Sequence, residues 1–227
     1  MDSDRAARKL AAILSADVKG YSRLMGEDDE ATVRTLTAHR MVMTTLIEQH
    51  RGRVVDSPGD NLLAEFASVV DAVRCAVEVQ HALKARNAEL PLNRRMEFRI
   101  GINLGDVIVE GERIYGDGVN IAARLEGLAE AGGVCIAGSV HEQVKAKVAV
   151  EYEYLGEREV KNIAEPVRVY RIVMEIPSPL AGEGQGEGAS RGAGSPKSEV
   201  QGSRFKVQSR KVKVNNLAGQ ARPCSCS

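Results

Sequence analysis

Two carboxylates placed at chain turns are the first residues whose types and spacing could do chemistry. Asp17 follows the apolar run Leu10–Ala16 and precedes Gly20, so a buried strand would deliver a carboxylate beside a glycine turn. Carboxylates suit Mg²⁺, and free backbone N–H groups after such a turn suit phosphate oxygens. Asp60 ends the tight turn Pro58–Gly59–Asp60 between two strand-like segments. Each turn is ordinary alone, but if the hairpin lies beside the first strand, the two carboxylates could share metal ions.

Further along the chain, an amide and a guanidinium occupy neighbouring helical positions. Asn120 and Arg124 lie four residues apart in the segment YGDGVNIAAR, so they share one face of an expected helix. Together they suit a ribose and a charged phosphate, and they are equally compatible with an ordinary exposed polar flank. Lys161, at the end of a strand-like segment, is by itself typical of a solvated lysine.

Alternating strand-like and helical patterns predict the elements that position these residues. The expected strands comprise residues 10–16, 53–57, 61–66, 96–102, 107–109, 133–137 and 168–173. The expected helices comprise residues 27–50, 68–83 and 119–129. The opening order β-α-β-β-α-β predicts an α+β fold with a ferredoxin-like βαββαβ core and extra C-terminal strands. We expect the helices to pack on a mainly antiparallel sheet and to cover one face of it.

Two details of this prediction bear on the candidate site. In the helix at 119–129, Ile121, Leu125 and Leu128 form the expected buried stripe, which leaves Asn120 and Arg124 on its flank. The segment from Met96 onward alternates apolar residues with polar ones, including Arg99, which predicts a half-buried strand.

Composition excludes several classes of function. The chain of 227 residues has 31 Lys and Arg against 31 Asp and Glu, so its charge argues against a nucleic-acid binder. No integral membrane segment is expected, because no apolar stretch reaches roughly 18 residues. No signal peptide is expected either, because the short N-terminal apolar run leads into an acidic turn and no small-residue cleavage site follows it. Cys75 and Cys135 are expected to be buried free thiols in a reducing compartment, which fits a cytoplasmic location. We expect no metal at the lone C-S-C of Cys224 and Cys226.

Composition changes abruptly near residue 176. Residues 177–227 carry a net charge of +5, which leaves −5 for the preceding part, and they begin with a low-complexity segment rich in Gly, Ser and Pro. We expect an N-terminal extension at 1–9, one domain at 10–176 and a disordered basic tail at 177–227. The tail could tether the chain to an anionic surface or to nucleic acid, but a solvated tail is the simpler interpretation.

The order of five stretches is more specific than any one of them. These stretches are AAILSADVKGYSRLM, GRVVDSPGDNLLAEF, FRIGINLGDVIVEG, YGDGVNIAARLEGLA and LGEREVKNIAEPVRVY. From about Leu10 to Val173, with no large gap, the chain resembles the class III nucleotidyl cyclase catalytic domain, that of adenylate and guanylate cyclases. A diguanylate cyclase shares the fold plan, but its expected G-G-[DE]-E-F turn is absent from this sequence.

The resemblance implies that two metal ions, Mg²⁺ or Mn²⁺, assist attack of the ribose 3′-OH on the α-phosphate. Asp17, Asp60 and the Val18 carbonyl would hold these ions. The residues that would bind the triphosphate are Gly20, Tyr21 and Ser22, through their backbone amides, and Lys161.

The resemblance also implies a homodimer. Asn120 would orient the ribose, and Arg124 would stabilise the reacting phosphate. In the family the aspartates come from one subunit, whereas the asparagine, arginine and lysine come from the other. Two equivalent sites would then lie at a two-fold interface.

Two purine-reading positions depart from the family's adenine pattern. Where a lysine and an aspartate or threonine usually stand, this chain has Asp56 and Arg113. Asp56 could accept hydrogen bonds from guanine while Arg113 donates to guanine O6. Alternatively, the pair could read adenine with the roles exchanged, or the two residues could pair with each other and read nothing.

Three classes of function follow from these observations. The surrounding sequence looks more like the bacterial adenylate-type branch, so we expect conversion of ATP to cyclic AMP and pyrophosphate, with GTP to cyclic GMP as the alternative. A weakly active, nucleotide-binding regulatory domain is a second hypothesis, motivated by the altered purine pair. A dimerisation module whose loops are incidental is the third.

Overall fold

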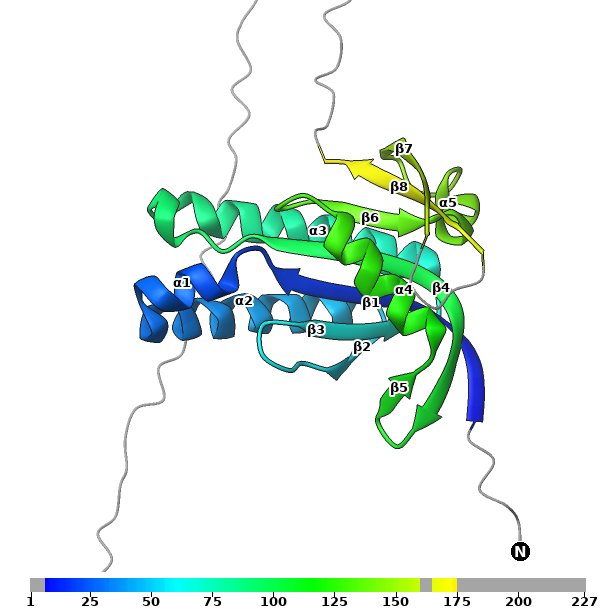
Figure 1. Cartoon of the computed structure of the whole chain (residues 1–227), viewed down its shortest axis with the longest axis horizontal. Coiled ribbons are helices and arrows are strands. Elements are labelled where there is room, and N and C mark those ends of the chain that lie inside the picture. Colours follow the sequence, from blue (N-terminus) through cyan, green and yellow to red (C-terminus); the bar gives the residue numbers. More distant parts are fainter. Residues whose placement is uncertain (1–6, 160–164, 175–227) are drawn as a thin grey trace, which may run out of the picture. The chain divides into compact units, whose positions relative to one another are not determined.

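The computed structural model describes residues 7–159 and 165–174 (Figure 1). The predictions for Lys161, for the two C-terminal cysteines and for the tail therefore lie outside the described residues. The elements, in chain order, are β1 (Ala7–Val18), α1 (Tyr21–Glu27), α2 (Asp29–Gln49), β2 (Gly52–Asp56), β3 (Leu62–Phe66), α3 (Val69–Ala88), a 3₁₀ turn (Leu92–Arg94), β4 (Phe98–Glu110), β5 (Arg113–Tyr115), α4 (Asp117–Leu128), β6 (Val134–Ala137), α5 (Gly138–Val144), β7 (Glu151–Arg158) and β8 (Val167–Val173).

The described strands form one mainly antiparallel sheet. Their order across the sheet is β2-β3-β1-β4-β6-β8-β7, and β5 pairs with β4 beside this path. The β4–β6 pair is parallel, and the other described pairs are antiparallel. The predicted α+β class is confirmed, and β2 and β3 form the predicted hairpin. The sequence patterns do not predict β5, α5 or β7, because β5 and α5 have only three and seven residues and β7 is a mostly exposed edge strand.

One face of the sheet packs against the long helices α2 and α3. Along β1, every second residue from Ala12 to Val18 joins the large apolar core on this face. The helices contribute large, fully buried side chains, including Met43, Ile47 and Leu83. Burying a side chain of this size stabilises the fold by roughly 1.5–3 kcal/mol, so this face supplies most of the apolar stabilisation.

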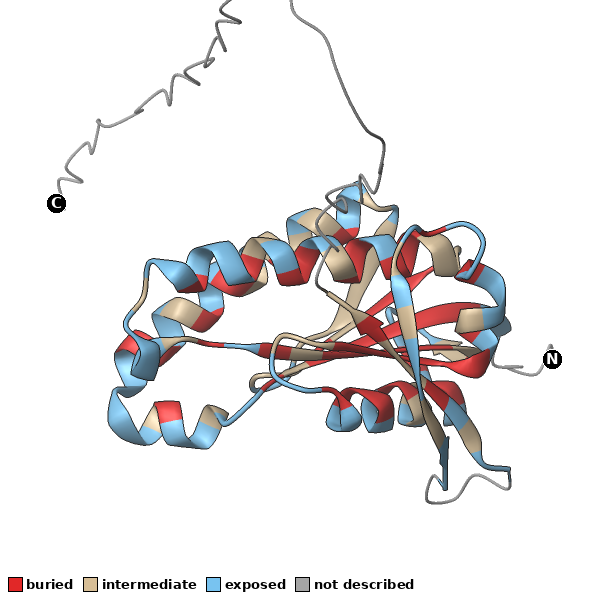
Figure 2. Ribbon diagram, turned by 90° about the horizontal axis from the view of Figure 1, so that it is seen from above, coloured by how far each residue is buried: buried red, intermediate tan, exposed pale blue. Residues whose placement is uncertain are grey.

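A helix also covers the opposite face, and Figure 2 shows helices on both sides of the sheet. Ala11 and Ile13 of β1 pack there with Ala122 of α4 in a second, smaller core. The helix comes this close because β4 carries Gly101. A methyl group at Gly101 would lie 2.2 Å from the Ala122 carbonyl oxygen and from the Glu126 backbone nitrogen. The expectation that helices cover one face only is therefore wrong.

The close packing of α4 also changes which of its residues are buried. The buried residues are Gly118, Ala122, Leu125 and Glu126. Of the stripe expected from the sequence, Leu125 is buried, whereas Ile121 is half-buried and Leu128 is 43% exposed. Small residues occupy the contact because the helix lies directly against the backbone of β4, where a larger side chain would not fit.

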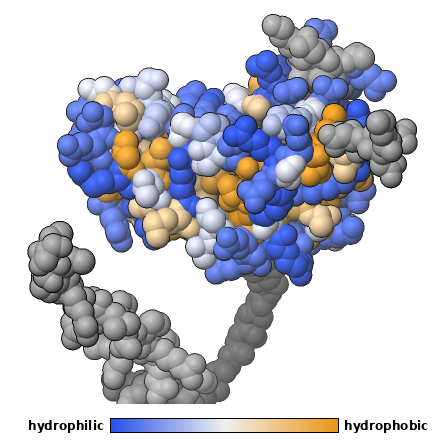
Figure 3. All heavy atoms as spheres, turned by 90° about the horizontal axis from the view of Figure 1, so that it is seen from below, coloured by the Kyte–Doolittle hydropathy of each residue, from blue (hydrophilic) through white to orange (hydrophobic). Residues whose placement is uncertain are grey.

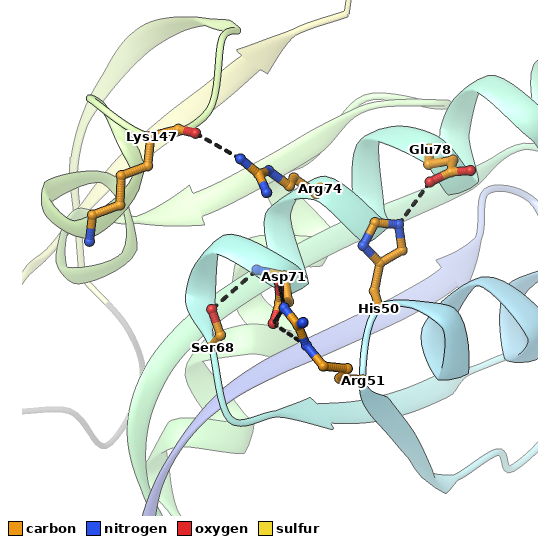
Figure 4. Close-up of polar contacts among 7 residues, drawn as sticks. All are labelled: His50, Arg51, Ser68, Asp71, Arg74, Glu78 and Lys147. Atoms are coloured by element: carbon orange, nitrogen blue, oxygen red, sulfur yellow. Dashed lines mark hydrogen bonds and ion pairs between the residues drawn. The ribbon is translucent and has the colours of Figure 1, made fainter.

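Polar contacts fix the end of α2 against the start of α3 (Figure 4). The Ser68 hydroxyl caps α3 by accepting a hydrogen bond from the Asp71 N–H. Arg51, which has a left-handed φ of 60°, donates to both carboxylate oxygens of Asp71. His50 Nε2 lies 2.8 Å from the Glu78 carboxylate. These contacts therefore fix the start of β2, which leads to the turn that carries Asp60.

The two described cysteines are buried free thiols, as the sequence predicts. Burial raises the pKa of Cys75 to about 12 and that of Cys135 to about 11, so both stay protonated near neutral pH. Within the part of the chain that the structure describes, no helix is both long and apolar enough to span a bilayer.

Candidate active site

Two carboxyl groups meet beside the ends of the central strands. Asp17 is the penultimate residue of β1, and Asp60 lies in the turn between β2 and β3. Because β1 pairs with β3 up to Ala16 and Leu62, the two carboxyl groups come within hydrogen-bonding reach. Burial, and then the Asp17 carboxyl, raise the pKa of Asp60 above its ordinary value. Two ionised acids this close repel each other, so the arrangement favours a cation beside them.

These donors fit a hard divalent cation that also contacts a substrate. Across residues 7–159 and 165–174, no group of three or more His, Cys, Asp and Glu could hold a metal by itself. Mg²⁺ is usually bound by one or two carboxylates and completes its octahedron with water and substrate phosphates. The backbone of Val18 faces the Asp60 carboxyl and opposes the rise in its pKa, so it lies at the same point. The residues therefore fit Mg²⁺ or Mn²⁺ bound together with a phosphate ligand.

Arg40 of α2 holds the turn that carries Asp60. Its Nη2 donates to the carbonyl oxygens of Gly59 and Asn61, the latter at 2.9 Å. These carbonyls flank Asp60 on both sides, so one guanidinium fixes the position of the turn. The sequence alone does not predict this role of Arg40, because no local pattern indicates that this part of α2 faces the hairpin.

Arg99 of β4 is a second site residue that the sequence analysis missed. It lies opposite Asp17 in the β1–β4 register, and its Nη2 donates to Asp17 Oδ2 at 2.7 Å. The same nitrogen lies 3.6 Å from Glu126 Oε1. A half-buried strand would leave Arg99 facing solvent, but α4 covers this face, and the Arg99 side chain is only 17% exposed.

Glu126 of α4 reaches the same place from the other side. Its Oε2 accepts hydrogen bonds from Ser15 Oγ at 2.9 Å and from Asn61 Nδ2 at 3.4 Å. Burial raises the pKa of Glu126 to about 7, and the neighbouring Asp17 adds to this effect, whereas Ser15 and Arg99 oppose it. A buried acid on α4 thus connects the helix to both aspartate-bearing segments.

The turn after β1 opens beside Asp17. Gly20 adopts a left-handed conformation, with φ 74° and ψ 30°, which glycine tolerates without strain. No side chain of the described residues caps the start of α1. Gly20 and Ser22 are exposed, and Tyr21 is half-buried. The predicted triphosphate-binding amides therefore belong to an uncapped turn that follows directly after the first aspartate.

Asn120 and Arg124 lie on the exposed face of α4. Among the described residues, neither side chain makes a hydrogen bond or ion pair with Asp17 or Asp60. Leu128, one further turn along, continues this exposed face. The structure thus brings the two aspartates together within one chain and leaves the amide and the guanidinium facing outward.

Large apolar side chains are exposed near both ends of α4. Tyr115, just before the helix, is 44% exposed, and Leu128 ends it. Figure 3 shows one face of the molecule, where apolar residues gather in patches separated by hydrophilic ones. The exposed α4 face with its two polar residues and its flanking apolar residues is a surface of mixed character, as interfaces between subunits often are.

Asp56 and Arg113 pair with each other. Asp56 Oδ2 lies 3.8 Å from Arg113 Nε, between β2 and β5. The Asp56 side chain is 39% exposed and the Arg113 side chain 63% exposed, so both stay accessible from solvent. This contact corresponds to the alternative in which Asp56 and Arg113 pair with each other instead of reading a purine. At 3.8 Å it is longer than a hydrogen bond.

Comparisons with known proteins agree with this geometry. The family model described as "Adenylate and Guanylate cyclase catalytic domain" matches residues 6–174. A Rhizobium meliloti protein named "Putative adenylate cyclase 3" is 45% identical over 171 residues, which cover 75% of this chain. The chain spans only 29% of the length of that relative.

Solved structures give the same result. A crystal structure of an adenylate/guanylate cyclase/hydrolase from Silicibacter pomeroyi has a TM-score of 0.71 and 40% identity, and covers 74% of this chain and 99% of its own. The guanylyl cyclase Cya2 has a TM-score of 0.64 and 26% identity, and covers 74% and 93%. With the two adjacent carboxyl groups, the sheet order and the family match in agreement, the chain belongs to the adenylate and guanylate cyclase catalytic domain family.

Proposed function

We propose that this chain is a nucleotide cyclase that converts ATP to 3′,5′-cyclic AMP and pyrophosphate as a homodimer. The observation that carries the proposal is the meeting of the Asp17 and Asp60 carboxyl groups beside an uncapped glycine turn. The family match covers both segments, and a relative at 45% identity carries an adenylate cyclase name. The domain would occupy residues 10–176, followed by the basic tail at 177–227.

Asp17, Asp60 and the Val18 carbonyl would hold two Mg²⁺ or Mn²⁺ ions, in keeping with a family that is generally metal-dependent. Bound there, the ions would acidify the ribose 3′-OH and neutralise the departing pyrophosphate. The protein's part at this half of the site is to hold the two carboxylates in position. Arg40 does this for the turn of Asp60, through the carbonyl oxygens on either side of it.

The remaining groups would bind and orient the nucleotide. The amides of Gly20, Tyr21 and Ser22 would take phosphate oxygens, as uncapped helix starts do. Asn120 and Arg124 would act on the nucleotide held by the partner subunit, Asn120 by fixing the ribose and Arg124 by meeting the charge that develops on the α-phosphate. Lys161 would join the triphosphate contacts.

A homodimer accounts for the outward direction of α4. In one chain Asn120 and Arg124 are exposed and make no polar contact with the aspartates among the described residues. A two-fold arrangement would bring the α4 of each subunit to the aspartates of the other and so create two equivalent sites. We place this dimer in the cytoplasm, where its substrate is found and where buried free thiols persist.

Asp56 and Arg113 bear on which purine nucleotide is the substrate. A guanylate cyclase is the second candidate, because Asp56 is an acceptor at a purine-reading position and a related solved structure is a guanylyl cyclase. The pairing of Asp56 with Arg113 also favours a third candidate, a regulatory domain with weak turnover, if the pair persists when nucleotide binds.

The test is product formation by the full chain from ATP and from GTP, assayed separately with Mg²⁺ and with Mn²⁺. We expect cyclic AMP, and we expect Asp60→Asn to lower the rate on the order of 100-fold or more, as loss of metal-site groups does. Asp29→Asn, an exposed aspartate at the start of α2, is the matched control and should leave the rate unchanged. Nucleotide binding without any product would favour the regulatory domain, and cyclic GMP alone would favour the guanylate cyclase.

A further inference from the structure

Arg99 is shared by two carboxylates that belong to different elements. Its Nη2 donates to Asp17 Oδ2 at 2.7 Å and lies 3.6 Å from Glu126 Oε1. The Nε of Arg99 is buried and has no hydrogen-bond partner among the described residues. A guanidinium in the most favourable position would use this donor as well, so its present orientation leaves hydrogen-bonding capacity unused.

Glu126 is arranged to accept the guanidinium. Its Oε2 is occupied by Ser15 Oγ and Asn61 Nδ2, whereas its Oε1 faces Arg99. Glu126 is only 6% exposed, so water contributes little to stabilising its charge. Among the described residues, Arg99 is the one cation that pairs with this carboxylate.

A divalent cation at Asp17 and Asp60 changes the balance between these two partners. The positively charged guanidinium of Arg99 contacts the Asp17 carboxylate. It therefore competes with a metal cation for this carboxylate and repels the cation. Once a cation binds Asp17, the guanidinium is left beside a like charge. Glu126 offers an acceptor on the other side, and a small rotation of Arg99 would shorten the 3.6 Å separation to a hydrogen bond.

We propose that Glu126 is a positioning residue for the metal site and acts through Arg99: it takes the guanidinium from Asp17 when a divalent cation binds. This inference rests on the proposed function, since it requires a metal at Asp17 and Asp60. Metal affinity is then set by an exchange of one ion pair for another. Without Glu126, Arg99 has no second carboxylate and stays on Asp17.

A different account gives Glu126 no such role. Its negative charge alone would attract a nearby cation, whichever way Arg99 points. The two accounts differ in what happens when Arg99 is absent. Exchange requires Arg99, so the effect of removing Glu126 must then mostly disappear, whereas a direct attraction must persist. A double-mutant cycle measures this difference.

The experiment is Mn²⁺ binding to the full chain by calorimetry at pH 8 without nucleotide, for the wild type, E126Q, R99Q and the double variant. We expect E126Q to weaken binding about tenfold, a typical effect of a group that supports a metal ligand. R99Q should tighten binding, because a competing cation is gone. The double variant should bind like R99Q. E142Q, which removes an exposed carboxylate paired with Lys145, is the control and should bind like the wild type.

Several outcomes would overturn the exchange. One is a tenfold loss from E126Q that is equally large in the R99Q background, and another is weaker binding in R99Q. Should E126Q unfold, E126D replaces it, because it keeps the charge but shortens the reach to Arg99. Exchange then predicts weaker Mn²⁺ binding, whereas direct attraction predicts unchanged Mn²⁺ binding. If the wild type shows no Mn²⁺ site that Asp60→Asn removes, the exchange fails. The proposed function fails only if the full chain forms no cyclic nucleotide, so the two failures are distinguishable.

Discussion

The two faces of the central sheet are built from the same strands in different ways. Against α2 and α3, β1 presents apolar residues such as Leu14, and large side chains fill the space between sheet and helices. Against α4, the alternate residues of β1 include Ser15 and Asp17, and the helix rests on glycine backbone. One face therefore stabilises the fold by apolar burial, while the other holds buried charged groups in fixed positions.

The difference shows how a single strand can serve both purposes. Because successive side chains alternate between faces, Asp17 can belong to the polar cluster while its neighbour Val18 is buried in the large core. The large core keeps the strand from moving, and the α4 face uses that rigidity. Substitutions on the α2–α3 face should therefore change stability, and those on the α4 face should change the site as well.

The largest expected effect on stability is on the α2–α3 face. Leu83→Ala, at a fully buried position of α3, should lower the free energy of unfolding by about 3–4 kcal/mol, because it leaves a cavity in a close-packed core. Leu92→Ala is the matched control, since Leu92 is 78% exposed, and it should change stability by less than about 0.5 kcal/mol. Denaturant unfolding measures both.

The Leu83→Ala protein should keep the Mn²⁺ affinity of the wild type below its unfolding transition. A large drop in Mn²⁺ affinity without unfolding would show that the two faces are not separate in the way we describe.

The second prediction concerns the close packing of α4. Gly101→Ala should destabilise the protein by about 2–3 kcal/mol, because the new methyl group meets backbone atoms that cannot rotate away. Since the helix must shift, Mn²⁺ affinity should fall too. Gly127 lies on α4 itself and has open space around it. Gly127→Ala should therefore stabilise the protein by about 0.5–1 kcal/mol. Equal effects at the two glycines would contradict the close approach.

The sequence predicts the α2–α3 face well, because local patterns determine it. The alternation after Met96 indicates β4, and the turn residues Pro58 and Gly59 indicate the β2–β3 hairpin, both of which the structure contains. The large core needs only apolar residues at the right period. Even the meeting of Asp17 and Asp60 follows once the hairpin is placed beside β1.

The α4 face is less predictable, because its residues gain their role from contacts between distant segments. Arg99 and Glu126 resemble solvent-facing charges in their own segments, and only the packing of α4 on β4 buries them. Arg40 reaches the Asp60 turn across 21 residues of sequence to Asn61. The glycine at 101 was the available signal, since a glycine inside a strand often marks a close backbone approach. The roles of the site residues stay predictions.

A pH titration provides the third test of the comparison. The pKa of Glu126 is raised to about 7, so between its ordinary value near 4.5 and about 7 the folded protein binds more protons than the unfolded chain. Stability from this group is therefore fully present below about pH 4.5 and is lost as the pH rises through 7. Asp60, whose pKa is also raised, acts in the same direction.

Without divalent metal, the wild type should lose on the order of 2 kcal/mol more than E126Q between pH 5 and pH 8. Unfolding at both pH values measures this difference. A wild type and an E126Q variant with parallel pH dependence would mean that Glu126 is not buried as a neutral acid at low pH.

The smallest effect on stability is expected at Asp56 and Arg113, whose side chains are 39% and 63% exposed. Their exposed contact of 3.8 Å should contribute no more than about 1 kcal/mol, so Arg113→Ala and Asp56→Lys should fold normally. Their effect on the base can still be large, because a good pair of hydrogen bonds to a base discriminates by 1–3 kcal/mol, or roughly tenfold and more. If Asp56 reads guanine, Asp56→Lys should shift the ratio of kcat/KM for ATP and GTP toward ATP by about that factor. An unchanged ratio would mean that Asp56 does not read the base and that base selection lies elsewhere in the site.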